Sequence, residues 1–301
     1  MSTCKNIQTL WRQALALVLA LAMALPLWGC GTDESDPSPS GSPTKPQETL
    51  TVTPSPTEGT SFYWDEDSDV SDFPDIYDYF SQETVETVLK FAKENGLQLT
   101  DWRPELIDLL NKNPETLNYV LYYPFNKDKE YEIDLSEYVG SETMPLLLQW
   151  DERWGYEEYA GEFMSISGCG PTTLSMVCIY LLDDPKYTPI YIAQFAEANG
   201  YGVKGNGSSW TLISQGGKQL GLDVTEIPLD ENRIIRNLNA GNPIIIVVGP
   251  GLFTTTGHFL VMTGYEDGYV TVNDPNSPRK TAQKWLLTDV MKDIKNLWVC
   301  R

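Results

Sequence analysis

One cysteine in this sequence lies in a setting that would make its thiol a nucleophile. Cys169 is flanked by Gly168 and Gly170, and Pro171 then opens a strongly apolar run that extends to Leu182. Proline is favoured in the first turn of a helix, so this run is predicted to be a helix that begins close to the cysteine. The unpaired N–H groups and the positive dipole end of a helix start favour the thiolate. The same N–H groups could stabilise an oxyanion.

The chain contains a single histidine, His258, in the segment Gly257-His258-Phe259. A lone histidine is more often structural than catalytic, but a cysteine–histidine pair is the minimum requirement for a thiolate nucleophile. If this chain performs cysteine chemistry with a histidine base, the base must be His258.

A third polar side chain should orient the imidazole, and Asn273 and Asp274 both compete for this position. The segment 266–268 ends in glycine and predicts a turn between two strands. A three-residue loop makes Asp274 the diagonal neighbour of His258 on the same face. A two-residue loop shifts the register by one residue and puts Asn273 on that face instead. The apolar alternation of the two strands favours Asp274, with Asn273 as the alternative.

The other cysteines give weaker signals. Cys4 and Cys30 belong to the N-terminal segment, and Cys178 lies among apolar residues, where it is predicted to be a small buried hydrophobe. Cys300 lies next to the C-terminus and has no predicted chemical role. Cys178 and Cys300 could form a disulfide, and the sequence leaves this open.

The elements that must position these residues lie in the segment 145–301. Apolar spacing, capping residues and turn signals predict helices first and an antiparallel sheet second, which makes an α+β domain. The predicted helices cover 171–182, 189–199, a segment starting at 208 or 209, 230–240 and 286–294. The predicted strands cover 243–248, 258–264 and 269–273.

A second, smaller module precedes this domain. Residues 62–140 are predicted to form an acidic, mainly helical subdomain, with apolar stripes at helical spacing between 75 and 135. Alternating aspartates at 65, 67 and 69 have the spacing of a calcium loop, but the glycine and the final glutamate of such a loop are missing. The subdomain is therefore predicted to serve packing or recognition, without chemistry of its own.

The N-terminal residues 1–29 are predicted to be a lipoprotein signal peptide. Their apolar run, 14–28, is too short for a transmembrane helix and fits the core of a secretory signal. The run ends in Leu27-Trp28-Gly29-Cys30, which resembles a bacterial lipobox with Cys30 as the acylated residue. An ordinary signal peptide or an uncleaved anchor is the alternative. Residues 30–61, rich in Pro, Ser and Thr, are predicted to be a tether.

The net charge of the chain excludes some classes of binding partner. The 42 acidic and 21 basic side chains give a net charge of −21 at pH 7. Nucleic acids and anionic lipid surfaces require clustered Lys and Arg, so neither is predicted as the main partner. We expect no metal and no organic cofactor, and we expect a monomer.

The chain carries four motifs in order: Gln149-Trp150-Asp151-Glu152-Arg153-Trp154-Gly155, Gly168-Cys169-Gly170-Pro171-Thr172, Gly257-His258-Phe259 and Asn273-Asp274-Pro275. Together they resemble a known family, the papain-like peptidases related to the double-glycine-leader, bacteriocin-processing cysteine peptidases. The resemblance is to the stand-alone branch and covers about residues 145–301. It implies a papain-like fold with Cys169 as nucleophile, His258 as general base and acid, Asp274 as orienting group and Gln149 as oxyanion donor.

The predicted function is therefore that of a membrane-anchored cysteine peptidase at the extracytoplasmic face of a bacterial cell membrane. Its substrate would be a peptide or protein, cleaved through a thioester acyl-enzyme. Two alternatives stay open from the sequence. One is a non-catalytic lipoprotein that binds a peptide or cell-wall fragment on the same fold, and the other is a cell-wall amidase.

Overall fold

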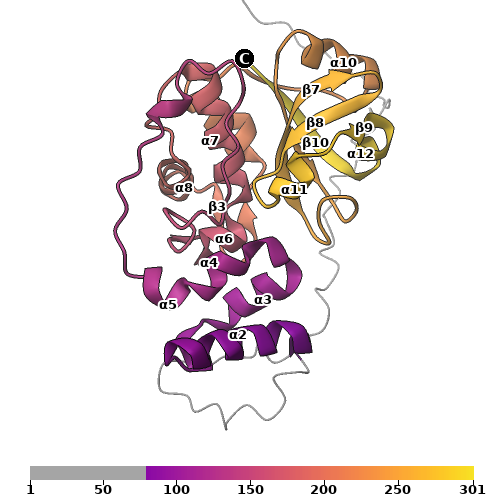
Figure 1. Cartoon of the computed structure of the whole chain (residues 1–301). Coiled ribbons are helices and arrows are strands. Elements are labelled where there is room, and N and C mark those ends of the chain that lie inside the picture. The colour runs from indigo at the N-terminus through magenta and orange to yellow at the C-terminus, as the bar shows by residue number, and fades with distance from the viewer. Residues whose placement is uncertain (1–78) are drawn as a thin grey trace, which may run out of the picture. The chain divides into compact units, whose positions relative to one another are not determined.

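The computed structural model describes residues 79–301 (Figure 1). The predicted signal peptide, Cys30, the tether and the beginning of the acidic subdomain lie outside the described residues. Within residues 79–301, no helix combines the length and the apolar character that a membrane crossing requires.

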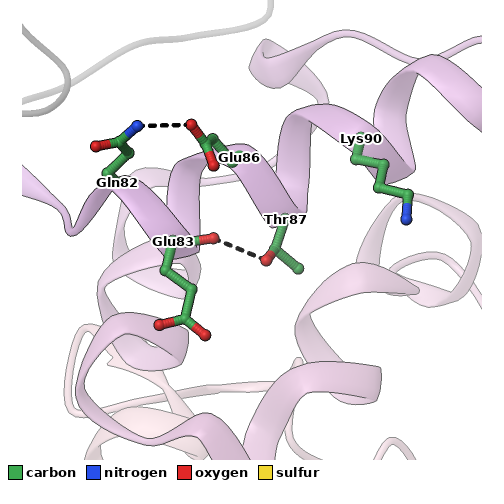
Figure 2. Close-up of a pocket in the computed structure, with 5 residues that line it drawn as sticks. All are labelled: Gln82, Glu83, Glu86, Thr87 and Lys90. Atoms are coloured by element: carbon green, nitrogen blue, oxygen red, sulfur yellow. Dashed lines mark hydrogen bonds between the residues drawn. The ribbon is translucent and has the colours of Figure 1, made fainter.

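The segment before the sheet domain is helical, as its apolar stripes predicted. Helix α2 (Gln82–Asn95) begins at Ser81, whose hydroxyl accepts from the Thr84 N–H, and ends at Gly96, whose φ of 69° suits glycine. Its polar side chains Gln82, Glu83, Glu86 and Lys90 are exposed (Figure 2). The remaining elements are η2 (Leu99–Asp101), α3 (Pro104–Lys112), η3 (Pro114–Thr116), α4 (Leu117–Leu121), α5 (Tyr123–Asn126) and η4 (Ser136–Tyr138).

Helices dominate the next part of the chain. Helix α7 (Cys169–Leu182) is almost entirely buried, which explains its apolar sequence, and α8 (Pro189–Ala198) packs against it. Thr188 caps α8 by accepting from the Tyr191 N–H, as predicted. The third predicted helix starts later than expected and opens with a π-helical turn, η5 (Leu212–Gly216), followed by α9 (Gly217–Gln219). Short elements complete this part: β1 (Glu158–Tyr159), β2 (Glu162–Phe163), α6 (Met164–Ser167), β3 (Gly202–Val203) and β4 (Gly207–Ser208).

A six-stranded antiparallel sheet forms the C-terminal part, in the order β5-β10-β6-β7-β8-β9. The apolar C-terminal end is strand β10, which pairs with both β5 and β6 inside the sheet. The sequence patterns predict no strand at this position, so β10 is an addition to the predicted sheet. The strands are β5 (Val224–Glu226), β6 (Ile244–Val248), β7 (His258–Glu266), β8 (Tyr269–Asn273), β9 (Trp285–Leu286) and β10 (Ile294–Cys300). The helices between them are α10 (Glu231–Asn239), α11 (Pro278–Thr281) and α12 (Leu287–Asp293).

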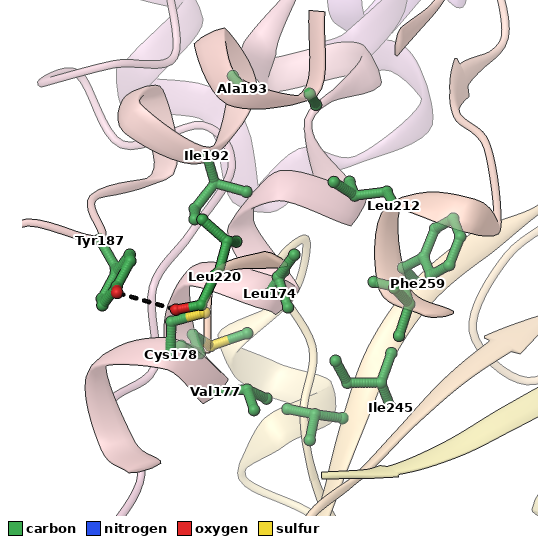
Figure 3. Packing of buried hydrophobic residues seen from close by; sticks show 14 of the residues in the cluster. Leu174, Val177, Cys178, Tyr187, Ile192, Ala193, Leu212, Leu220, Ile245 and Phe259 are labelled. Atoms are coloured by element: carbon green, nitrogen blue, oxygen red, sulfur yellow. Dashed lines mark hydrogen bonds between the residues drawn. The ribbon is translucent and has the colours of Figure 1, made fainter. Parts of the chain in front are cut away.

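Helices cover both faces of this sheet, so the central strand β6 is buried and apolar at every position. In β6, Ile245 and Val247 join the core formed with α7 and α8, which Figure 3 shows in part. The alternate residues Ile244 and Ile246 join a second core with α10 and α12. Side chains of neighbouring strand residues point to opposite faces, which explains this division. The predicted α+β class is confirmed.

The hairpin between β7 and β8 differs from the prediction at its turn. The connection is a two-residue turn in which Asp267 (φ 50°) and Gly268 (φ 90°) are both left-handed, and Glu266 pairs with Tyr269. The expected three-residue loop is therefore wrong. A register shift between Met262 and Gly264 then restores the expected pairing farther along the strands.

Candidate active site

The first element of the site is the start of α7, where Cys169 lies at the first helical position and is partly exposed. The glycines on either side are required by close packing. A Cβ atom on Gly170 would lie 2.4 Å from Ser208 Oγ, and one on Gly168 would lie 2.4 Å from the Met164 carbonyl oxygen. The glycines thus allow the chain around the thiol to pack against β4 and α6 without a clash.

The second element is the edge of the sheet, where His258 is the first residue of β7. The Thr173 hydroxyl on α7 donates to the Phe259 carbonyl over 3.1 Å, which fastens the cysteine-bearing helix to the strand next to the histidine. The His258 side chain and the backbone groups of Phe259 and Gly170 lie near enough to the Cys169 thiol to lower its pKa. The helix start and the strand start therefore bring the thiol and the imidazole together.

The third element is Asp274, directly after β8. His258 Nε2 lies 2.7 Å from Asp274 Oδ1, and both side chains are buried. This interaction occupies Nε2, so Nδ1 is the ring nitrogen left to face Cys169. The Asn273 side chain instead donates to the Pro145 carbonyl over 2.9 Å, away from the imidazole. The structure thus places Asp274, and not the alternative Asn273, beside the histidine.

The register shift in β7 explains this choice between neighbours. Close to the turn, the pairing of Tyr265 with Val270 follows the register that favoured Asn273. Beyond the shift, Met262 pairs with Val272, which is the register that favoured Asp274. One extra residue in β7 therefore determines which polar side chain reaches His258.

The electrostatics of the pair favour a thiolate and an imidazolium. Burial acts to raise the pKa of Cys169, but the hydrogen bond and the charge of His258 outweigh it, so the pKa lies below the usual cysteine value. Burial acts to lower the pKa of His258, but the charge and hydrogen bond of Asp274, assisted by Cys169, raise it above the usual histidine value. Between these two pKa values the proton resides on the imidazole and the sulfur is charged.

Gln149 forms hydrogen bonds both to the segment that follows Asp274 and to the segment that precedes Cys169. Its backbone N–H donates to the Pro275 carbonyl over 2.8 Å, which ties it to the segment that carries Asp274. Its side-chain Nε2 donates to the Ser165 carbonyl over 2.7 Å and reaches the Ile166 carbonyl over 3.3 Å. Within residues 79–301, no hydrogen bond joins Gln149 to Cys169. The predicted oxyanion role therefore stays a prediction.

The other two cysteines within residues 79–301 are buried in the core. Cys178 and Cys300 are fully buried free thiols, so the disulfide left open by the sequence is not formed. Burial raises the pKa of both thiols, that of Cys300 to about 12. Figure 3 shows Cys178 inside the apolar core between Leu174, Val177 and Leu220. Across residues 79–301, His, Cys, Asp and Glu side chains form no group of three that could hold a metal ion.

Comparison with known proteins shows which family the sequence matches and which solved structures are similar to it. A family model described as "Peptidase_C39 like family" matches residues 142–299, more than half of the chain. No functionally curated protein matches. Among solved structures, the chain is similar to the peptidase domain of Streptococcus ComA, a bi-functional ABC transporter involved in a quorum-sensing pathway. That match has 18% identity and a TM-score of 0.37, and covers 44% of this chain and 90% of that chain.

Two further solved structures are similar. One is a C39-like peptidase from Bacillus anthracis, with 16% identity, a TM-score of 0.33, and coverage of 57% of this chain and 98% of that chain. The other is a double glycine motif protease from an AMS/PCAT transporter, solved in complex with the leader peptide. It has 19% identity, a TM-score of 0.35, and coverage of 52% of this chain and 88% of that chain.

Proposed function

The chain belongs to the Peptidase_C39 like family of cysteine peptidases, and from this premise we propose that it hydrolyses peptide bonds through Cys169, His258 and Asp274. The observation that carries the proposal is the buried contact of 2.7 Å between His258 Nε2 and Asp274 Oδ1, next to a cysteine at a helix start. A non-catalytic binding protein would not need an imidazole held by a buried carboxylate beside a thiol of lowered pKa.

The first half of the reaction is acylation. The Cys169 thiolate attacks the substrate carbonyl carbon, and the carbonyl π electrons move to the oxygen. When the tetrahedral species collapses, the C–N bond breaks and a thioester forms on the sulfur. The imidazolium of His258 gives its proton to the leaving amine. Asp274 keeps the ring oriented and stabilises its charge until that transfer.

The second half is deacylation. The now neutral His258 accepts a proton from a water molecule, whose oxygen attacks the thioester carbonyl. The C–S bond breaks, the acid product leaves, and the sulfur and imidazole return to the thiolate–imidazolium state. The raised pKa of His258 favours this return.

The developing oxyanion requires donors, and we assign this role to the Cys169 backbone N–H and the Gln149 amide. One N–H of Gln149 is fixed by the Ser165 carbonyl over 2.7 Å, which orients the amide. The same nitrogen reaches the Ile166 carbonyl only over 3.3 Å, a weak contact that a charged oxygen would replace.

A peptide-library screen with mass-spectrometric detection tests the proposal. Full-length wild-type protein should cleave a subset of peptides, whereas Cys169→Ala and His258→Ala should cleave none of them. Cleavage that persists in Cys169→Ala would overturn the proposal. Purified cell-wall peptides belong in the same screen, because the same cysteine chemistry hydrolyses their amide bonds.

We also propose that Cys30 is acylated and anchors the chain at the extracytoplasmic face of a bacterial membrane. The support is the sequence Leu27-Trp28-Gly29-Cys30 after an apolar run of signal-peptide length. Metabolic labelling with a fatty acid in a bacterial host should label the wild type and not Cys30→Ser. Equal labelling of both proteins, or of neither, would refute the anchor.

A further inference from the structure

Two side chains from the helical segment contact the part of the chain that carries the Asp274 carboxylate. Asn113 and Glu115 lie at the start of η3, before the family-matched residues 142–299. Their partners lie in the segment 276–279, directly after Asp274. The segment 79–127 therefore does more than cover an apolar surface.

Asn113 acts on the turn that follows Asp274. Its Nδ2 donates to the Asn276 carbonyl over 2.9 Å and contacts Asn276 Oδ1 over 3.1 Å. Trp150 Nε1 donates to the same carbonyl over 3.1 Å, so two side chains hold this peptide group. The Asn276 N–H in turn donates to Asp274 Oδ1 over 2.8 Å, at the oxygen that contacts His258. A continuous chain of hydrogen bonds thus joins Asn113 to the imidazole.

Glu115 acts on α11, the short helix after the turn. It accepts a hydrogen bond from the Ser277 hydroxyl and a second from the Arg279 N–H over 2.9 Å. Ser277 is the N-cap of α11, and its oxygen accepts from the Lys280 N–H. The same helix carries Thr281, whose hydroxyl accepts from the Asp274 N–H over 2.9 Å. Glu115 therefore holds α11 in place, and α11 carries the Thr281 hydroxyl that binds the Asp274 N–H.

The helical segment that carries Asn113 and Glu115 makes further contacts with residues 150–166. Tyr119 in α4 stacks on Tyr156 with ring centroids 4.4 Å apart, and the Tyr156 hydroxyl donates to the Tyr119 carbonyl over 2.7 Å. Asn126 Nδ2 donates to Glu152 over 2.9 Å. The helical segment is thus bonded to residues 150–166 on one side and to the Asp274 segment on the other.

We propose that Asn113 and Glu115 are positioning residues of the peptidase, and that the helical segment 79–127 is an intramolecular brace that holds the Asp274 carboxylate against His258. This inference rests on the proposed function of Cys169, His258 and Asp274. It gives the segment a role in catalysis without contact to the substrate.

Asn113→Ser is the sharpest variant for a test. Asn113 Oδ1 also caps η3 by accepting from the Glu115 N–H over 3.1 Å, and a serine hydroxyl can replace that cap. A serine is too short to reach Asn276, and it introduces no charge. The matched control is Asp108→Asn, which breaks an exposed ion pair with Lys112 on α3.

The readout is the titration of His258, the only histidine of the chain, by NMR of full-length protein labelled in the histidine side chain. The charged or titratable groups that act on this imidazole are Asp274 and Cys169. Weaker positioning of Asp274 should lower the pKa of His258 in Asn113→Ser and reduce kcat about tenfold, the equivalent of about 1.4 kcal/mol, with KM unchanged. Asp108→Asn should match the wild type in both measurements.

A double variant separates positioning from general destabilisation. In an Asp274→Asn background, the added Asn113→Ser change should no longer move the pKa of His258, because the group it positions has lost its charge. Should Asn113→Ser lower only the melting temperature and leave the pKa and kcat at wild-type values, the brace is refuted while the peptidase proposal stands. Should wild-type protein show neither a raised His258 pKa nor cleavage, both fall.

Discussion

The charge of Asp274 can be removed almost without changing the shape of the site. In Asp274→Asn, the amide oxygen can occupy the position of Oδ1 and still accept from His258 Nε2 and from the Asn276 N–H. The amide nitrogen would replace Oδ2, which is buried and has no hydrogen-bond partner among the described residues. The substitution therefore tests the carboxylate charge itself.

The size of the effect follows from the burial of the pair. The His258 and Asp274 side chains are 6% and 1% exposed, so water screens their interaction little. A hydrogen bond to a charged group contributes about 1.5 to 3 kcal/mol and a neutral one about 1 kcal/mol. The difference is about 0.5 to 2 kcal/mol, and the middle of this range corresponds to a fall of about one unit in the pKa of His258 and about tenfold in rate.

The direction in which the pH profile of kcat/KM moves follows from His258, which carries the proton. Asp274 raises the pKa of His258, so its neutralisation lets the imidazolium lose its proton at lower pH. The alkaline limb of kcat/KM for a peptide from the library screen should move to lower pH by the same amount as the NMR titration of His258. The control is Glu266→Gln, which removes an exposed carboxylate at the far end of the same hairpin, where it pairs with Lys284. An unchanged or higher pKa of His258 in Asp274→Asn would refute the reasoning.

Two further predictions concern the surroundings of the thiol. Gly170→Ala places a Cβ atom 2.4 Å from Ser208 Oγ and should destabilise the fold by about 1–3 kcal/mol, whereas Gly257→Ala meets nothing within 4 Å and should melt near the wild type. Equal melting temperatures of the two variants would show that β4 does not pack against the helix start. Iodoacetamide should leave Cys178 and Cys300 unmodified in the folded protein and alkylate both after unfolding, because both are fully buried. Mass spectrometry measures the modification. Modification of either thiol in the folded state would contradict the packing of this core.

Much of the site region could be predicted from the sequence because its signals are local. Pro171 after a glycine-flanked cysteine marked the helix start, and the single histidine left one choice of base. The structure places Cys169 and His258 together with Asp274, and their catalytic roles stay predictions. The hairpin shows how a local argument can fail at one step. The turn has two residues and not three, and the register shift in β7 compensates for the error at Asp274.

The parts that the sequence did not predict depend on distant contacts. Asn113 and Asn276 are 163 residues apart, and no short motif links an asparagine at a helix end to a turn beside a carboxylate. Strand β10 was missed because its seven residues follow a helix directly and pair with β5 and β6, far away in the sequence. Both features arise from tertiary pairing, which apolar spacing within one segment does not encode.

The most direct test of the central claim is the alkylation rate of Cys169 in full-length protein, followed from about pH 4 to about pH 10 by mass spectrometry. In the wild type, the imidazolium of His258 should keep the thiol ionised well below the usual cysteine pKa, so that alkylation stays fast in mildly acidic buffer. In His258→Ala, the midpoint of the profile should move up toward the ordinary value. Identical profiles for the two proteins, both with an ordinary thiol midpoint, would contradict a thiolate–imidazolium pair at this site.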